Sequence, residues 1–130
     1  MANELKYFSI ERQGDVTIIT PTVADFLGET TNFEAKRELI ALARGENPQK
    51  VVIDFHNVER FSTEFIGVLL SFKRQLNPGP SGWREIKLCS LKSGFGFTFR
   101  TMEGSTPFVI VDTLTHALES LPESDTDNAR

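Results

Sequence analysis

Two adjacent hydroxyl side chains, Ser62 and Thr63, are the residues of this chain whose type and position could do chemistry. They stand directly before an apolar stretch with helical spacing, where a hydroxyl most often caps the helix by accepting a hydrogen bond from a backbone amide. A hydroxyl there can also accept a phosphoryl group, which would add about −1.5 to −2 charge at the helix N-terminus. The local pattern alone favours capping.

A strand, a polar loop and an amphipathic helix must position these hydroxyls. The apolar, β-branched run from Val51 to Phe55 suits a strand covered on both faces, and Asp54 marks its C-terminal end. Residues 56–61 form the loop, and the helix begins near Thr63. Its broad apolar face, which we expect to face the core, consists of Phe65, Val68, Leu69, Phe72 and Leu76, widened by Ile66 and Leu70.

A polar strip runs along the other side of this helix. It consists of Glu64, Gly67, Ser71, Arg74 and Gln75, and Thr63, Gly67 and Arg74 share one edge of it. A glycine inside a helix costs about 1 kcal/mol against alanine, so Gly67 needs a reason. That reason is either a notch for a partner's backbone, which we favour, or close packing against a loop. The rest of the strip is equally typical of a solvated helix face, and Glu64 of an ordinary first-turn acid.

The stretch from Asp54 to Leu70 resembles the STAS domains, in particular the anti-sigma-factor antagonists of bacterial signalling. In that family a buried strand ends in aspartate, and the next helix begins with aspartate, a phosphorylatable serine, a hydroxyl residue, glycine, an aliphatic residue and glycine. Here Ile66-Gly67-Val68-Leu69-Leu70 matches the helix, and Thr63 stands at the phosphate acceptor. Ser62, Glu64 and Phe65 replace the family's aspartate, second hydroxyl and glycine. The order of elements resembles the family over residues 8–121, and the motif over about twenty residues.

The resemblance implies a non-enzymatic signalling protein that binds an anti-sigma factor with serine/threonine kinase activity. That kinase would phosphorylate Thr63, or alternatively Ser62, and a serine/threonine phosphatase would reverse the modification. The expected partner-binding residues are His56, Asn57, Ser62, Thr63, Glu64, Gly67, Ser71 and Arg74. An alternative is a STAS interaction module in a larger signalling assembly, in which Thr63 caps the helix and is never phosphorylated.

A two-component receiver is a further alternative, because Asp54 ends a buried strand as a phosphate-accepting aspartate would. Receivers also need an acidic pair after the first strand and a lysine after the last one. Thr20-Pro21 and Asp112 occupy those places, so the sequence disfavours this class.

Enzymatic, metal and cofactor sites are not indicated. His56 and His116 lie in different elements with no acidic or cysteine partner at ligand spacing, and the glycine-containing turns lack the lysine of a phosphate-binding loop. Cys89, the single cysteine, falls in an apolar alternating stretch and is typical of a buried strand thiol.

Composition sets the class of molecule. A chain of 130 residues, 39% hydrophobic and 25% charged, forms one globular domain. The net charge of −4 and the pI near 5.2 argue against nucleic acid or an anionic membrane as the main partner. With neither a signal peptide nor a membrane-spanning apolar run recognisable, we expect a cytoplasmic protein.

The remaining pattern predicts an α/β fold: a single STAS-type domain over residues 1–121, with a mostly parallel sheet, an N-terminal hairpin and about four helices. Strands are expected at 7–12, 16–20, 86–90 and 108–111. Helices are expected at 32–44, stopped by Gly45 and Pro48, and after Asp112 or Thr113, one of which caps it. In segment 91–104 the phenylalanines at 95, 97 and 99 recur with a period of two, which favours an extended chain. The resemblance to STAS domains instead implies a short helix in this segment. Residues 122–130 read as a disordered acidic tail.

Overall fold

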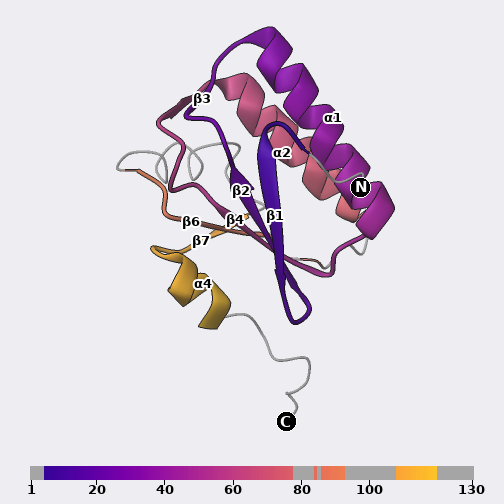
Figure 1. The fold of residues 1–130 in the computed structure, drawn as a ribbon, viewed down its shortest axis with the longest axis vertical. Coiled ribbons are helices and arrows are strands. Elements are labelled where there is room, and N and C mark those ends of the chain that lie inside the picture. The colour runs from indigo at the N-terminus through magenta and orange to yellow at the C-terminus, as the bar shows by residue number, and fades with distance from the viewer. Residues whose placement is uncertain (1–4, 78–83, 85, 93–107, 120–130) are drawn as a thin grey trace.

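The computed structural model describes residues 5–77, 84, 86–92 and 108–119, and the chain forms a sheet with helices on both faces (Figure 1). The five strands of the sheet lie in the order β1-β2-β4-β6-β7. They span Phe8–Gln13 (β1), Val16–Pro21 (β2), Lys50–Asp54 (β4), Ile86–Cys89 (β6) and Phe108–Ile110 (β7). Only β1 and β2 pair antiparallel, and the other neighbours are parallel. The predicted hairpin and mostly parallel sheet are confirmed.

Local sequence explains the strand ends. Gly14, between β1 and β2, has a φ of 62°, which glycine adopts without steric cost in a tight turn. Pro21 is the last residue of β2, and the N–H of Thr22 after it still donates to the Tyr7 carbonyl at 2.9 Å. Asp54 ends β4 as predicted.

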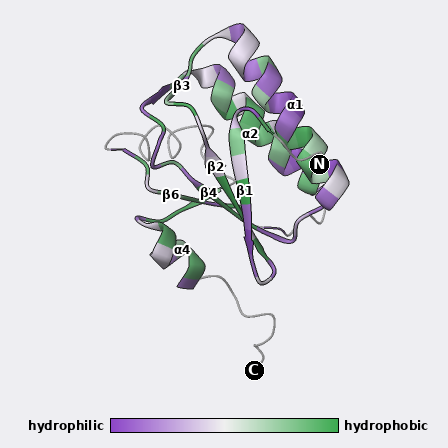
Figure 2. Ribbon diagram, in the orientation of Figure 1, coloured by the Kyte–Doolittle hydropathy of each residue, from purple (hydrophilic) through white to green (hydrophobic). Residues whose placement is uncertain are grey.

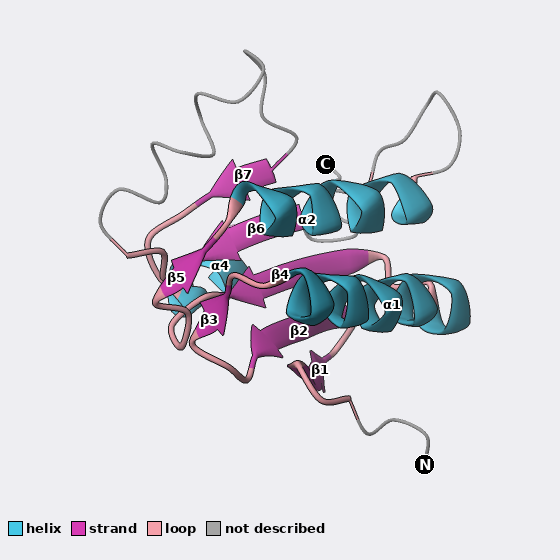
Figure 3. Cartoon of the chain, turned by 90° about the horizontal axis from the view of Figure 1, so that it is seen from above, coloured by secondary structure: helices cyan, strands magenta, loops and turns pink. Residues whose placement is uncertain are grey.

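Two long helices, α1 (Glu29–Glu46) and α2 (Thr63–Leu76), lie side by side over one face of the sheet, whereas the short α4 (Leu114–Glu119) lies under the other (Figure 3). Helix α2 begins at Thr63 as predicted. Helix α1 is longer than predicted, since it begins at Glu29 rather than Asn32 and passes through Gly45. Asn47, with a φ of 48°, ends α1 instead, and its N–H donates to the Ala43 carbonyl at 3.0 Å.

The sequence allows either Asp112 or Thr113 as the cap of α4. The Thr113 hydroxyl takes this position, because its Oγ1 accepts a hydrogen bond from the His116 N–H at 3.0 Å. Helix α4 covers the far face of β4 and β6 through Ala117.

The core follows the alternation of the central strands. Val51 and Ile53 of β4 point toward α1 and α2, whereas Val52 joins Cys89 and Ala117 in a second cluster under α4. Both long helices are amphipathic, with hydrophobic residues on one side and polar residues on the other, and their apolar sides pack on the sheet (Figure 2). The predicted apolar face of α2 is buried, with Phe65, Leu69 and Phe72 fully inaccessible to solvent.

Two short segments outside the predicted strands pair with each other. Asp25–Phe26 (β3) and Arg60–Phe61 (β5) form a second, two-stranded parallel sheet beside the start of α1 and α2. Strands of two residues carry no hydrophobic period, so the sequence offered no signal for them.

Three expectations fall outside the described residues: the weak helix within 91–104, the phenylalanines at 95, 97 and 99, and the tail 122–130. The three helices described are therefore α1, α2 and α4. In the described part of the chain, no helix has both the length and the apolar character needed to span a membrane.

Candidate functional site

The start of α2 meets the start of α1 and the small β3-β5 sheet, and the two hydroxyls lie there. Ser62 is the N-cap residue with extended backbone (φ −101°, ψ 171°), but its side chain makes no capping hydrogen bond. Instead Ser62 Oγ donates to the Phe26 carbonyl at 3.4 Å and accepts from Asn32 Nδ2 at 3.3 Å. The prediction that Ser62 caps the helix through its hydroxyl is wrong, because this side chain ties α2 to α1 and β3.

Thr63 differs from its neighbour. It is the first residue of α2 and is exposed, and its hydroxyl makes no hydrogen bond to any described residue. The predicted capping role therefore finds no support in Thr63 either. A hydroxyl in this position is accessible to another protein and lies at the positive end of the helix dipole.

A cluster of buried and half-buried phenylalanine rings packs against the start of α2. Phe65 is fully buried and stacks on Phe26 with ring centroids 4.2 Å apart and an interplanar angle of 20°. Phe55 and Phe61 also pack against the Phe65 ring, with centroid distances of 6.1 and 5.9 Å. Such pairs stabilise by about 0.5–1.5 kcal/mol beyond the area they bury. Phe65, which replaces the glycine of the family pattern, therefore anchors α2 to β3.

The polar strip of α2 faces solvent as predicted. Glu64, Gly67, Arg74 and Gln75 are exposed and Ser71 is half-buried. Within it, Arg74 Nη2 lies 3.5 Å from Ser71 Oγ. A Cβ built on Gly67 would meet no described atom within 4 Å. Close packing against a described loop is thus excluded as the reason for this glycine.

The loop between β4 and β5 is held by hydrogen bonds at several points. The buried Asp54 carboxylate accepts from the His56 N–H through Oδ1 (3.1 Å) and pairs with His56 Nδ1 through Oδ2 (3.1 Å). Asn57 Nδ2 donates to the Pro21 carbonyl at 3.2 Å. Lys92 Nζ donates to the His56 carbonyl at 3.2 Å and lies 3.6 Å from Glu59 Oε2.

The end of this loop is equally constrained. Val58 is fully buried, and the N–H groups of Glu59 and Arg60 both donate to the Ala24 carbonyl, at 2.7 and 3.1 Å. Arg60 forms two hydrogen bonds to the Asp25 carboxylate, at 3.1 and 2.8 Å, which raise the pKa of the guanidinium. These contacts anchor the loop at both its start and its end.

The structure places His56, Asn57, Ser62, Thr63 and Glu64 between the C-terminal end of β4 and the start of α2, whereas Ser71 and Arg74 lie about two to three turns further along the exposed side of α2. The sequence reasoning missed Asn32 and Phe26, which hold Ser62, and Lys92, which holds the loop. It also missed Phe33 and Leu27, which are exposed beside the site. Phe33 lies off the buried side of α1, which includes Ala35, Leu39 and Leu42, and an aromatic residue outside that spacing was the available signal.

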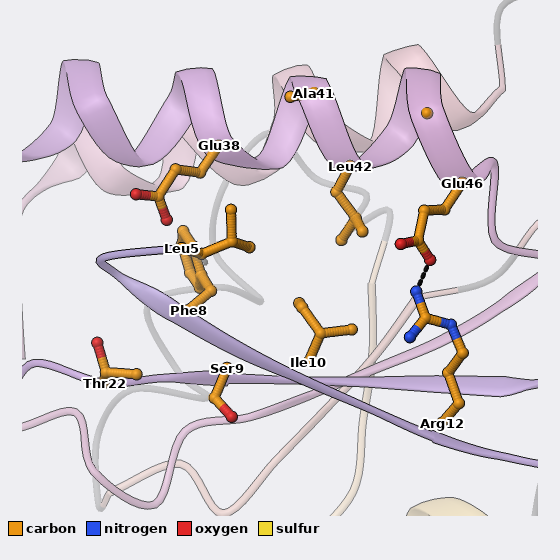
Figure 4. A pocket seen from close by; sticks show the side chains of 11 residues that line it. Leu5, Phe8, Ser9, Ile10, Arg12, Thr22, Glu38, Ala41, Leu42 and Glu46 are labelled. Atoms are coloured by element: carbon orange, nitrogen blue, oxygen red, sulfur yellow. Dashed lines mark ion pairs between the residues drawn. The ribbon is translucent and has the colours of Figure 1, made fainter. Parts of the chain in front are cut away.

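A cleft of about 760 Å³ lies elsewhere, between β1 and α1 (Figure 4). Apolar side chains from both elements line it, including Phe8, Ile10 and Leu42, and an ion pair between Arg12 and Glu46 lies at one end. Among the described residues, no group of three or more histidine, cysteine or acidic side chains could hold a metal ion.

No protein-family model and no curated protein matches the sequence. Solved structures do match. An anti-sigma-factor antagonist (STAS) domain protein from Planctomyces limnophilus has a TM-score of 0.71 at 23% identity, over 86% of this chain and 94% of its own. The chain has the STAS fold. A candidate anti-sigma factor antagonist from Thermotoga maritima gives 0.68 at 20% identity, covering 86% and 92% of the two chains.

The anti-sigma factor antagonist SpoIIAA, in its unphosphorylated form, shares the STAS fold with a TM-score of 0.62 at 13% identity, over 86% of this chain and 94% of that one. The likeness concerns the fold, because identities of 13–23% leave most side chains different. The function of this STAS-fold chain must therefore be argued from its own site.

Proposed function

We propose that this protein is an anti-sigma-factor-antagonist-like regulator of transcription in the bacterial cytoplasm. It has no enzymatic activity of its own and binds a protein partner through the loop 56–62 and the polar strip of α2. Phosphorylation of Thr63 switches this binding. The observation that carries the proposal is the contrast between the two hydroxyls: Thr63 is exposed and makes no described hydrogen bond, whereas Ser62 is tied to Phe26 and Asn32. Thr63 is therefore preferred over Ser62 as the acceptor.

The nature of the partner is inferred from the fold. Solved chains with this fold are anti-sigma factor antagonists, and one of them is described in an unphosphorylated form. We assign this chain an anti-sigma factor with serine/threonine kinase activity as its partner, and a serine/threonine phosphatase to remove the modification.

The switch acts at the interface rather than on the fold. A phosphate on Thr63 adds about −1.5 to −2 charge, and the dipole of α2 favours it by only about 0.3–1 kcal/mol. The buried stack of Phe65 on Phe26 holds the start of α2, so we expect α2 to stay in place when Thr63 is phosphorylated. A like or desolvated charge at a partner interface costs several kcal/mol, about 2–5 where the charge is left buried and unpaired. The adjacent, exposed Glu64 adds to the repulsion.

Two features suit this surface for recognition. The hydrogen bonds of Asp54, Asn57 and Lys92 anchor the loop, and an anchored loop loses less conformational entropy on binding than a free one. Gly67 leaves open space on the exposed side of α2, one turn beyond Thr63, where a partner's backbone can approach closely.

The proposal is tested by incubating the purified protein and ATP with each anti-sigma factor kinase domain of the source organism, followed by peptide mapping of the phosphate. We expect one phosphate on Thr63, lost in Thr63→Ala and retained in Ser62→Ala. A phosphate on Ser62 would contradict the assignment of the acceptor. Binding to a kinase domain without any phosphorylation would favour the constitutive interaction module instead.

A further inference from the structure

Helix α1 carries acidic side chains on its β1 side and basic side chains mainly on its outer surface, with Arg37 at the border of the two. Its acidic side chains on the β1 side are engaged: Glu34 accepts from the Tyr7 hydroxyl at 2.8 Å, and Glu38 accepts from the N–H groups of Lys6 and Tyr7 at 2.9 and 3.0 Å. Glu46 pairs with Arg12 of β1 (Figure 4). These carboxylates stabilise the N-terminal strand against the helix.

The basic side chains of α1 lie on the outer surface. Lys36, Arg37 and Arg44 line a shallow depression of about 370 Å³ together with Phe33 and Ile40, and no acidic residue lines it. Lys36 and Arg37 form no hydrogen bond or ion pair with any described residue. We refer to these five residues as the α1 patch. It is a cationic surface on a protein whose net charge is −4.

The α1 patch also has an exposed aromatic residue. Phe33 is 62% exposed, and Leu27, just before the helix, is 45% exposed. They are the exposed large hydrophobic side chains of the described part of the chain. Exposed aromatic and arginine side chains in one place are typical of the anchoring residues of protein interfaces.

The α1 patch runs beside the polar strip of α2. Asn32, which precedes Phe33, contacts Ser62 at the start of α2, and Arg44 Nε donates to Gln75 Oε1 at 3.3 Å near the helix ends. The two helices therefore run in the same direction with their starts together, as Figure 3 also shows. Phe33 thus lies on the outer side of α1, at the end of the molecule where Thr63 begins α2.

From these contacts we propose that the α1 patch docks an acidic, amphipathic segment of the protein partner, with Phe33 as its apolar anchor and Lys36, Arg37 and Arg44 facing its carboxylates. This rests on the proposed function for the identity of the partner. It also explains the sign of the switch. An acidic segment that is attracted to the α1 patch is repelled by a phosphate on Thr63 at the neighbouring helix start.

The first test measures dissociation constants for the phosphorylating kinase domain by calorimetry. We expect Phe33→Ala to weaken binding by about tenfold or more, as for an interface anchor. The double variant Lys36→Gln/Arg37→Gln should weaken it by about five- to tenfold, and less so at high salt. Its matched control is Gln13→Glu/Gln49→Glu, which changes the net charge by the same amount. Both glutamines are exposed and lie outside the α1 patch: Gln13 is the last residue of β1, and Gln49 follows the C-terminal end of α1. The control should stay within about twofold of wild type.

Unchanged affinity in both α1 variants, with wild type still bound and phosphorylated, would overturn the α1 patch and leave the proposed function intact. A second test does not need the kinase. A synthetic amphipathic peptide with leucine on one helical face and glutamate on the other is titrated into the isotope-labelled protein, with a leucine-lysine peptide as control. We expect the acidic peptide alone to shift the amide resonances of residues 33–44, and to lose this effect with Lys36→Gln/Arg37→Gln. Shifts located elsewhere, or equal shifts with the basic peptide, would overturn the inference.

Discussion

Replacing Gly67 by alanine separates the stability of α2 from its role in binding. Gly67 lies inside the helix, is exposed, and leaves room for a Cβ with no described atom within 4 Å. The substitution therefore gains helix propensity without a clash, which is about 0.8–1 kcal/mol of unfolding free energy. In a chain of this length that corresponds to a rise of roughly 3–5 °C in Tm. Urea and thermal unfolding followed by circular dichroism measure both values.

The same substitution should weaken binding of the kinase partner. A methyl group pushed into a close backbone contact costs about 1–3 kcal/mol, or roughly five- to 150-fold in Kd. Gly45→Ala is the matched control, because Gly45 also lies in a helix and also leaves space for a Cβ, but belongs to the far end of α1. This control should bind the partner with wild-type affinity.

The predicted gain in stability and the predicted loss of affinity can each be contradicted by its own result. A lower unfolding midpoint for Gly67→Ala would mean that the glycine is required by the fold. A more stable Gly67→Ala protein with unchanged partner affinity would mean that Gly67 is not a notch for the partner.

Three further predictions concern the switch residue, the buried thiol and the core. Thr63→Glu should weaken kinase binding by about tenfold or more, while the neutral Thr63→Gln of similar size has a much smaller effect; equal losses would indicate a steric rather than an electrostatic cause. Burial, and secondarily the Asp54 carboxylate, raises the pKa of Cys89 from 9.0 to about 11. The stability contributed by keeping the Cys89 thiol protonated in the fold is therefore complete below pH 9 and declines from there toward pH 11. Over this interval the wild type should lose more unfolding free energy than Cys89→Ala. Parallel pH profiles of the two proteins would contradict the raised pKa of Cys89. Leu69→Ala, at a fully buried position, should lower the unfolding free energy by about 2–5 kcal/mol in urea titrations, and a loss below 1 kcal/mol would show that α2 packs loosely on the sheet.

The framework of the site could be predicted from the sequence because its elements are long and periodic. The β-branched run before Asp54 fixed β4, and the spacing of apolar residues after Thr63 fixed both the start of α2 and its buried face. The same helical period also predicted the exposed polar strip of α2, since residues on the side opposite the buried apolar face point into solvent.

The details that decide chemistry depend on distant contacts. The Ser62 hydroxyl turns away from its own helix because Asn32 and the Phe26 carbonyl, far away in sequence, offer it partners. Strands β3 and β5 are too short to show a period. Their pairing depends on contacts between segments far apart in sequence, namely the packing of Phe26 and Phe61 on Phe65 and the hydrogen bonds from Arg60 to Asp25. Local propensity also misplaced the end of α1, where Gly45 continues the helix.

The central claim is that a phosphate on Thr63 releases the partner while leaving the fold intact. Its most direct test compares the affinity of the same kinase domain for unmodified protein and for protein phosphorylated stoichiometrically on Thr63, with amide spectra of both forms. We expect phosphorylation to lower the affinity a hundredfold or more, corresponding to about 3 kcal/mol, with spectral changes confined to the neighbourhood of Thr63. Equal affinity for the two forms would contradict it.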